Sequence, residues 1–134
     1  MRIEDCFIGQ SASLTKQFGS DEVMAFAELT LDRNPIHLDE SYAKKSLFGE
    51  RLVHGFLVGS LISAVFGTKL PGEGAIYLHQ EMNFRKPVHH GDVITATVTV
   101  TKIRKEKSLL YFDTRCENDR GEVVIDGKAI LKVS

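Results

Sequence analysis

The feature that most constrains this fold is an apolar segment at residues 52–67, LVHGFLVGSLISAVFG. Apolar side chains occupy nearly every side of a helix drawn through it, which is the pattern of a buried helix and not of an amphipathic surface helix. The segment is shorter than the roughly 20 residues that a membrane span needs. We therefore expect a helix enclosed by the rest of the chain, with its glycines, serines and alanine allowing close approach of backbone or ligand.

The segments around this helix alternate between apolar and polar residues, which is typical of strands with one buried face. Between positions 94 and 100, for example, every second residue is Ile, Ala or Val and the others are Thr. Short turns separate the later segments and favour an antiparallel meander. The predicted fold is α+β, an antiparallel five-stranded sheet wrapped around the central apolar helix. The five expected strands are 11–18, 75–84, 93–103, 109–116 and 123–133.

Two further helices are predicted between the first strand and the apolar segment. Ser20 is a suitable N-cap for the first, and the two acids that follow it suit the positive end of the helix dipole. This helix must end near Asn34-Pro35, because the residue before a proline is disfavoured in helical geometry. Asp39 can cap a second, short helix.

Composition excludes several classes of protein. The chain of 134 residues carries 17 basic and 18 acidic residues, for a formal net charge of −1. This balance argues against a broad nucleic-acid footprint and against a polybasic membrane patch.

We find neither repeat nor linker and expect one domain over residues 1–134. Cys6 and Cys116 are far apart without metal-site spacing, which favours two free thiols, and the acidic start is unlike a signal peptide, so a cytoplasmic location is expected.

The first candidate site is the pair Asp32 and His37, which stand on either side of the rigid Asn34-Pro35 step. Across such a turn both side chains can converge on one point and hold a water molecule, as general acid–base catalysis requires. Histidine suits this task because its ordinary pKa is near neutrality. The alternative is purely structural, with Asp32 in a turn and His37 as a capping residue.

Two other constellations are weaker. Gly55 follows His54 at the start of the apolar helix, where backbone N–H groups lack intrahelical acceptors and could bind a developing oxyanion; the alternative is a packing glycine. His54 itself is expected to be a hydrogen-bonded structural residue and not a second catalyst. His89, His90 and Asp92 suggest a metal site, but adjacent residues of a strand point to opposite sides. An exposed turn is the favoured interpretation there, and no metal site is predicted.

Several motifs together resemble a known family. They are LTLDRNPIH at 29–37, RLVHG at 51–55, LPG at 70–72, FRKPV at 84–88 and GD at 91–92. In this order they are similar to the hydratase-2 motif and its surroundings in MaoC-like proteins, especially the (R)-specific enoyl-CoA hydratases linked to polyhydroxyalkanoate synthesis. The resemblance covers nearly the whole chain.

The resemblance implies a hot-dog fold, usually dimeric, and the reversible addition of water to trans-2-enoyl-CoA to give (R)-3-hydroxyacyl-CoA. It assigns the catalytic roles to Asp32 and His37 and the bond to the thioester oxygen to the Gly55 N–H. Asn34 matches an asparagine that orients the loop, and Ser63 matches a supporting serine near the catalytic site. The chemistry itself needs a base for water, a donor for the oxyanion and a proton for C2, and hence neither a metal nor a redox cofactor. The sequence leaves open which of Asp32 and His37 is the base and which the acid.

Phe66 and Leu131 are candidate walls of the acyl pocket, and a bulky Phe66 would favour short acyl chains. The alternative is that both are ordinary core residues.

Three other functions compete with hydration. A hot-dog thioesterase would release free CoA, but such enzymes generally lack the run from Asp32 to His37. A non-catalytic acyl-CoA-binding module would need the pocket without the catalytic pair. A dehydratase of acyl chains on a carrier protein is closest in chemistry, and the basic residues here are too scattered to mark its docking patch.

Overall fold

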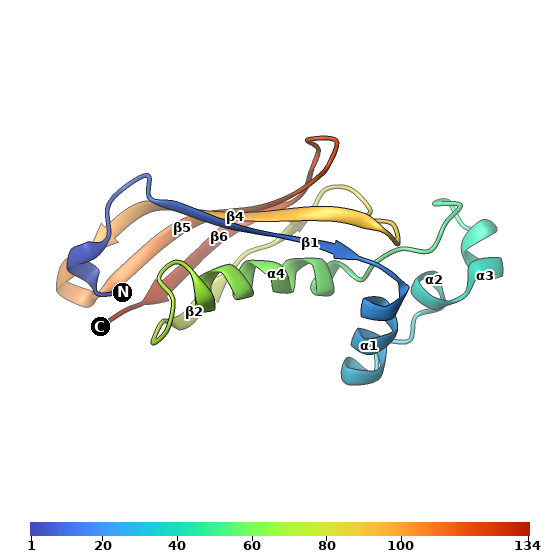
Figure 1. Ribbon diagram of the computed structural model, residues 1–134, viewed down its shortest axis with the longest axis horizontal. Helices are drawn as coiled ribbons and strands as arrows, with labels where there is room; N and C mark the ends of the chain where they lie inside the picture. Colours follow the sequence, from blue (N-terminus) through green and yellow to red (C-terminus); the bar gives the residue numbers. More distant parts are fainter.

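A computed structural model covers residues 1–134, and its architecture is a curved antiparallel sheet with one long helix against its inner face (Figure 1). The strands are β1 (Ser11–Phe18), β2 (Ile76–Gln80), β3 (Asn83–Phe84), β4 (Asp92–Arg104), β5 (Leu109–Asn118) and β6 (Val123–Lys132). The helices are α1 (Ser20–Thr30), α2 (Pro35–Leu38), α3 (Glu40–Lys44) and α4 (Gly55–Thr68), with short 3-10 turns η1 (Ile3–Asp5) and η2 (Lys105–Lys107). No helix has both the length and the apolar character needed to cross a membrane.

The sheet has six strands, not the five expected from sequence. The predicted strand 75–84 is broken into β2 and β3, and both pair with β6. The break lies where the Glu81 carbonyl crosses Gly127 so closely that a Cβ on Gly127 would come within 1.8 Å of the Glu81 oxygen. Only glycine fits there, and the chain bends past β6 instead of continuing as one strand.

The strand order is β1-β4-β5-β6-β2, with β3 also on β6. The expected meander is therefore correct for β4, β5 and β6 but wrong for the segment 75–84, which lies at the far edge instead of beside β4. The physical reason is that β1 already occupies that side of β4, in a register that pairs Ser11 with Thr99 and Phe18 with Asp92.

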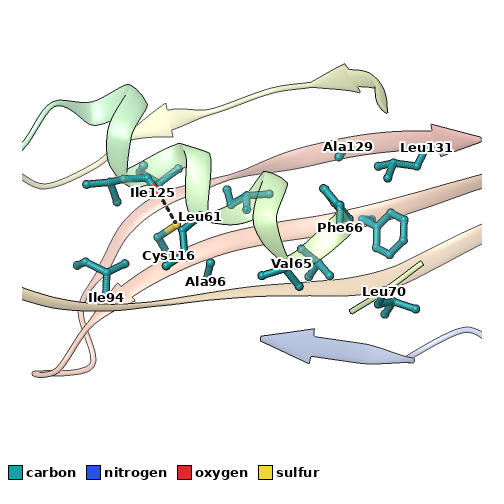
Figure 2. Close-up of a cluster of buried hydrophobic side chains, with 14 of the residues drawn as sticks. Leu61, Val65, Phe66, Leu70, Ile94, Ala96, Cys116, Ile125, Ala129 and Leu131 are labelled. Atoms are coloured by element: carbon teal, nitrogen blue, oxygen red, sulfur yellow. Dashed lines mark hydrogen bonds between the residues drawn. The ribbon is translucent and has the colours of Figure 1, made fainter. Parts of the chain in front are cut away.

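The core lies between α4 and the inner face of the sheet. Ile94, Ala96, Val98 and Val100 of β4 are each at most 1% exposed, as their alternation predicts. Figure 2 shows Leu61, Val65 and Phe66 of α4 facing Cys116, Ala129 and Leu131 of β5 and β6. Both cysteines are free, as expected, and both are buried.

One face of α4 is left uncovered, which differs from the expectation of a helix buried all round. Val58, Ile62 and Val65 are fully buried against the sheet, whereas Phe56 is 67% exposed and Ser60 and Ser63 are exposed. A sheet can cover only one side of a helix that lies on it, so the apolar residues on the other side stay open in the single subunit.

The helices α1, α2 and α3 lie together at one end of the sheet (Figure 1), and capping residues set where α1 and α3 begin. Gly19, not Ser20, is the N-cap of α1, and its N–H donates to the Glu22 carboxylate at 2.7 Å. Ser20 instead meets the His90 Nδ1 with its hydroxyl at 3.0 Å. Leu31, with a left-handed φ of 68°, ends α1 before the Asn34-Pro35 step, and Asp39 caps α3 by accepting the Tyr42 N–H, as predicted.

Candidate active site

The local structure of the turn after α1 brings the side chains of Asp32 and His37 close together. The Asn34 side chain caps α2 by accepting the Ile36 N–H at 3.3 Å, and Pro35 is the first residue of the helix, where no backbone donor is needed. His37 follows in this single turn, and the Asp32 carboxylate accepts the Asn34 N–H at 3.4 Å. Asn34 thus orients the loop between the two side chains.

The His37 ring is held in one tautomer. Its Nδ1 lies 2.9 Å from the carbonyl oxygen of Leu52, an acceptor only, so Nδ1 must carry the proton. In the neutral ring the Nε2 lone pair is therefore free. Burial lowers the pKa of His37 below its ordinary value of 6.5, and the neighbouring His54 acts in the same direction, while the Leu52 carbonyl and Asp32 oppose the shift. His37 is consequently neutral at pH 7 and able to accept a proton.

Asp32, His37 and the buried His54 converge. One carboxylate oxygen or ring nitrogen from each lies within 4.8 Å of the others. One water hydrogen-bonded to two groups spans about 4.5 Å between them, given bonds of about 2.8 Å. The carboxylate and the His37 ring can therefore share a single water. The same three side chains are also the ones that could hold a metal ion.

Gly55 is the first residue of α4, at the position where a helix leaves its N–H without an intrahelical acceptor. Its Cα faces the ring of Phe84 so closely that a Cβ would lie 2.6 Å from the Phe84 Cε1. A side chain at position 55 would displace that ring. The glycine thus has a steric reason in addition to its available N–H.

A cavity of about 540 Å³ joins these groups, with Asp32, His37, His54 and Gly55 in its wall. Its remaining surface is largely apolar, from Phe48, Phe56, Phe84, Pro87 and Ile125 among others. The bridge between Leu52 and His89 and the bond from the Val53 N–H to the Val88 carbonyl fasten 84–89 beside the start of α4. A polar pair in the wall of a largely apolar, open cavity suits a substrate that is mostly apolar and carries one reactive polar group.

The basic residues at the cavity wall are already paired. Arg85 Nε lies 3.1 Å from the Asp126 carboxylate and Lys86 Nζ lies 2.6 Å from that of Glu122. The Lys86 ammonium, with Asn118 and Arg120, lowers the pKa of Glu122 to about 2. Both cations of the wall are therefore already offset by carboxylates.

The other residues singled out in the sequence lie elsewhere. Ser63 was expected near Asp32 and His37. It is instead exposed on the open face of α4, beside Tyr77 and Met82, and does not line the cavity within the subunit. Phe66 and Leu131 are each 1% exposed in the core and do not line the cavity. Phe66 packs edge-on against Phe112 at 4.7 Å, which agrees with the alternative interpretation of a core residue.

Sequence reasoning missed the aromatic wall of the cavity. It expected His54 to be a hydrogen-bonded structural residue, and His54 is indeed buried and hydrogen-bonded to the Asp32 carbonyl. Phe56 and Phe84 stack at 6.0 Å over the cavity although 28 positions separate them in the chain. The motif FRKPV was visible, but nothing in its spacing shows that it folds against α4. His89 lies 3.6 Å from Glu50 and 3.8 Å from Asp92, outside this cavity.

The chain belongs to the family of proteins with a MaoC like domain, whose family model matches residues 8–119. It is 48% identical over 130 residues to an (R)-specific enoyl-CoA hydratase of Rhodospirillum rubrum, covering 97% of this chain and 90% of the relative. It is also 39% identical over 125 residues to a mitochondrial 3-hydroxyacyl-[acyl-carrier-protein] dehydratase of Arabidopsis thaliana, covering 91% and 74% of the two chains.

Among solved structures, the (R)-hydratase of Aeromonas caviae involved in PHA biosynthesis superimposes with a TM-score of 0.95 at 42% identity. The match covers 98% of this chain and 99% of that one. The fold is therefore the hot-dog fold that the sequence predicted, with six strands in place of five.

Proposed function

We propose that this protein catalyses the reversible (R)-specific hydration of trans-2-enoyl-CoA to (R)-3-hydroxyacyl-CoA, as a hydro-lyase. The observation that carries the proposal is that Asp32, His37 and the start of α4 at Gly55 line one apolar cavity. Relatives in this family that bear the name (R)-specific enoyl-CoA hydratase support it.

The His37 Nε2 takes a proton from water as the water oxygen bonds to C3 of the enoyl thioester. The Asp32 carboxylate accepts the other hydrogen of that water and directs its lone pair at C3. Electrons of the C2–C3 double bond move toward the thioester carbonyl, and the Gly55 N–H stabilises the negative charge that develops on its oxygen. This division of roles between Asp32 and His37 is part of the proposal, and it is supported by the tautomer of His37, which leaves the Nε2 lone pair without a proton.

Protonation at C2 completes the reaction. The protonated His37 returns its proton to C2 as the carbonyl re-forms, so water is added in full and the ring is again neutral. Both steps occur on the face of the substrate that meets the pair, which gives syn addition. These steps use neither a metal nor a redox cofactor, and we propose that the enzyme needs none.

The assay that tests this function follows the enoyl absorbance of crotonyl-CoA in buffer with EDTA, with a thiol reagent in a parallel reaction. We expect loss of absorbance without thiol release. Thiol release would identify a thioesterase. Absence of any turnover would favour the non-catalytic acyl-CoA-binding module. A rate restored only by added metal would refute the metal-free mechanism. A substrate on a carrier protein, tested beside its CoA counterpart, distinguishes the dehydratase named for the Arabidopsis relative.

The activity should have an acid limb set by His37. Because burial lowers the pKa of His37 below 6.5, and only the neutral ring accepts a proton, the acid limb of kcat/KM should have its midpoint below pH 6.5. His54, Asp32 and the nearby His90 are the titratable groups around this ring. A limb with its midpoint above 6.5 would contradict the assignment of His37 as the base.

We also propose a homodimer, in which a second copy covers the open face of α4 and β2. Ile76, Tyr77 and Leu78 of the edge strand β2 are 56%, 39% and 53% exposed, next to Phe56 of α4. An apolar edge strand in the open is a surface that proteins cover. Sedimentation at micromolar concentration should show a dimer, and Leu78→Lys should shift it toward monomer; a wild-type monomer would refute the proposal.

The proposal also includes a metabolic role and a cellular location. The similar (R)-hydratase of A. caviae, which is involved in PHA biosynthesis, supports a role in the supply of polyhydroxyalkanoate monomers from fatty-acid β-oxidation, and the two free thiols suit the cytoplasm. Cell fractionation and polymer content after deletion of the protein test these two points.

A further inference from the structure

His54 is buried at the junction of the three parts of the site. It is 1% exposed and is the N-cap of α4, directly before Gly55. Among the ionisable side chains in the cavity wall, that of His54 is the most deeply buried. The mechanism above does not use it.

Two different parts of the ring contact the two catalytic residues. The Nε2 lies 3.0 Å from the backbone carbonyl of Asp32, and the ring face stacks on the His37 ring with centroids 3.8 Å apart at 27°. The ring of Phe26 from α1 contacts His54 at 4.7 Å, tilted by 58°. The imidazole is thus clamped between the helix that precedes the catalytic loop and the ring of His37.

The hydrogen bonding fixes the form of this histidine. The Asp32 carbonyl only accepts, so the His54 Nε2 must carry a proton. The Nδ1 is buried without any partner, which is unfavourable for a polar atom and would be worse for an N–H. Neutral histidine with the proton on Nε2 satisfies both conditions. A leucine or phenylalanine would remove the unpartnered atom but also the bond to Asp32.

We propose that His54 is a positioning residue, whose Nε2–H holds the main chain at Asp32 while its ring face sets the orientation of the His37 ring. His37 is otherwise held by one hydrogen bond, from Nδ1 to Leu52, about which the ring can turn. Stacking removes that freedom and keeps Nε2 aimed at the cavity. The effect on catalysis rests on the proposed hydration.

Two substitutions separate the two contacts. His54→Phe keeps a flat ring against His37 but has no donor for the Asp32 carbonyl. His54→Gln keeps a side-chain N–H but no ring. Because a misplacement of about 1 Å can cost about 10²-fold in rate, we expect each to lower kcat for crotonyl-CoA by about tenfold or more with KM within about threefold. His89→Gln, at a histidine outside the cavity, is the matched control and should keep the wild-type rate.

Rates are compared per folded molecule, with the folded fraction taken from thermal melts. A merely structural role would lower the melting temperature and leave kcat within about twofold of wild type in whichever variant folds, and this would overturn the proposal. A rise in KM with unchanged kcat would overturn it too, since it would place His54 in substrate binding.

A spectroscopic measurement tests positioning without any turnover. Long-range ¹H–¹⁵N spectra of the wild type should show His54 with its proton on Nε2. The His37 Cε1 proton should be shielded by the stacked ring in wild type and His54→Phe, and should lose that shielding in His54→Gln. A proton on the His54 Nδ1, or equal shielding in all three proteins, would overturn the proposal even if crotonyl-CoA proves not to be a substrate.

Discussion

Asp32→Asn and His37→Gln should each lower kcat for crotonyl-CoA hydration by about 10² or more, which is the usual contribution of a positioned acid–base group. Each substitution keeps the approximate shape of the side chain. Asparagine loses the charge that orients the water, and glutamine has no basic nitrogen to accept its proton. Because the two groups share one water, the double variant should be little slower than either single variant.

The controls for this prediction lie outside the cavity. Asp21→Asn in the first turn of α1 and His89→Gln repeat the same chemical changes at residues that do not line it. Both should retain wild-type rates, and all four proteins should keep the wild-type circular dichroism. A rate near that of wild type in folded Asp32→Asn or His37→Gln would remove the pair from the mechanism.

Gly55→Pro should abolish the oxyanion contact while leaving α4 intact. Proline is favoured at the first position of a helix, and His54, with φ −55° and ψ 133°, already has the extended geometry that precedes a proline. The substitution removes the N–H proposed to bind the thioester oxygen, and loss of one such donor typically costs about 10²–10³ in kcat.

The design must first remove a clash, because any Cβ at position 55 meets the Phe84 ring at 2.6 Å. We therefore place the proline in a Phe84→Ala background and compare it with Gly55→Ala in the same background, which adds the Cβ but keeps the N–H. The proline variant should be slower than the alanine variant by about 10²–10³. Equal rates in the two double variants would show that the Gly55 N–H does not stabilise the oxyanion.

The convergence of Asp32 and His37 could be foreseen because its geometry is local. A proline at position 35 forces a break, an asparagine at 34 can cap the next turn, and the four residues between Asp32 and His37 then bring the two side chains together. An antiparallel sheet around one helix followed similarly from alternating strands and one apolar segment, and the family resemblance implied the hot-dog fold. These features depend on residues close in the chain, for which spacing and side-chain type carry the information.

The parts that could not be foreseen depend on contacts between distant residues. The break between β2 and β3 depends on Gly127 in β6, and the aromatic wall of the cavity depends on Phe84 meeting Gly55. The hydrophobicity of 52–67 does not distinguish burial within one subunit from burial by a second copy, so the exposed face of α4 was unexpected. In the same way, a serine at 63 on that face could not be placed relative to the cavity.

In the proposed mechanism, one face of the cavity delivers both the hydroxyl and the proton to an enoyl thioester. The stereochemistry of crotonyl-CoA hydration by the wild-type protein in ²H₂O, read from the product by chiral analysis and NMR, tests this delivery. We predict (R)-3-hydroxybutyryl-CoA with a single deuterium at C2 on the same face as the new hydroxyl group. An (S) product, or deuterium on the opposite face, would contradict the account.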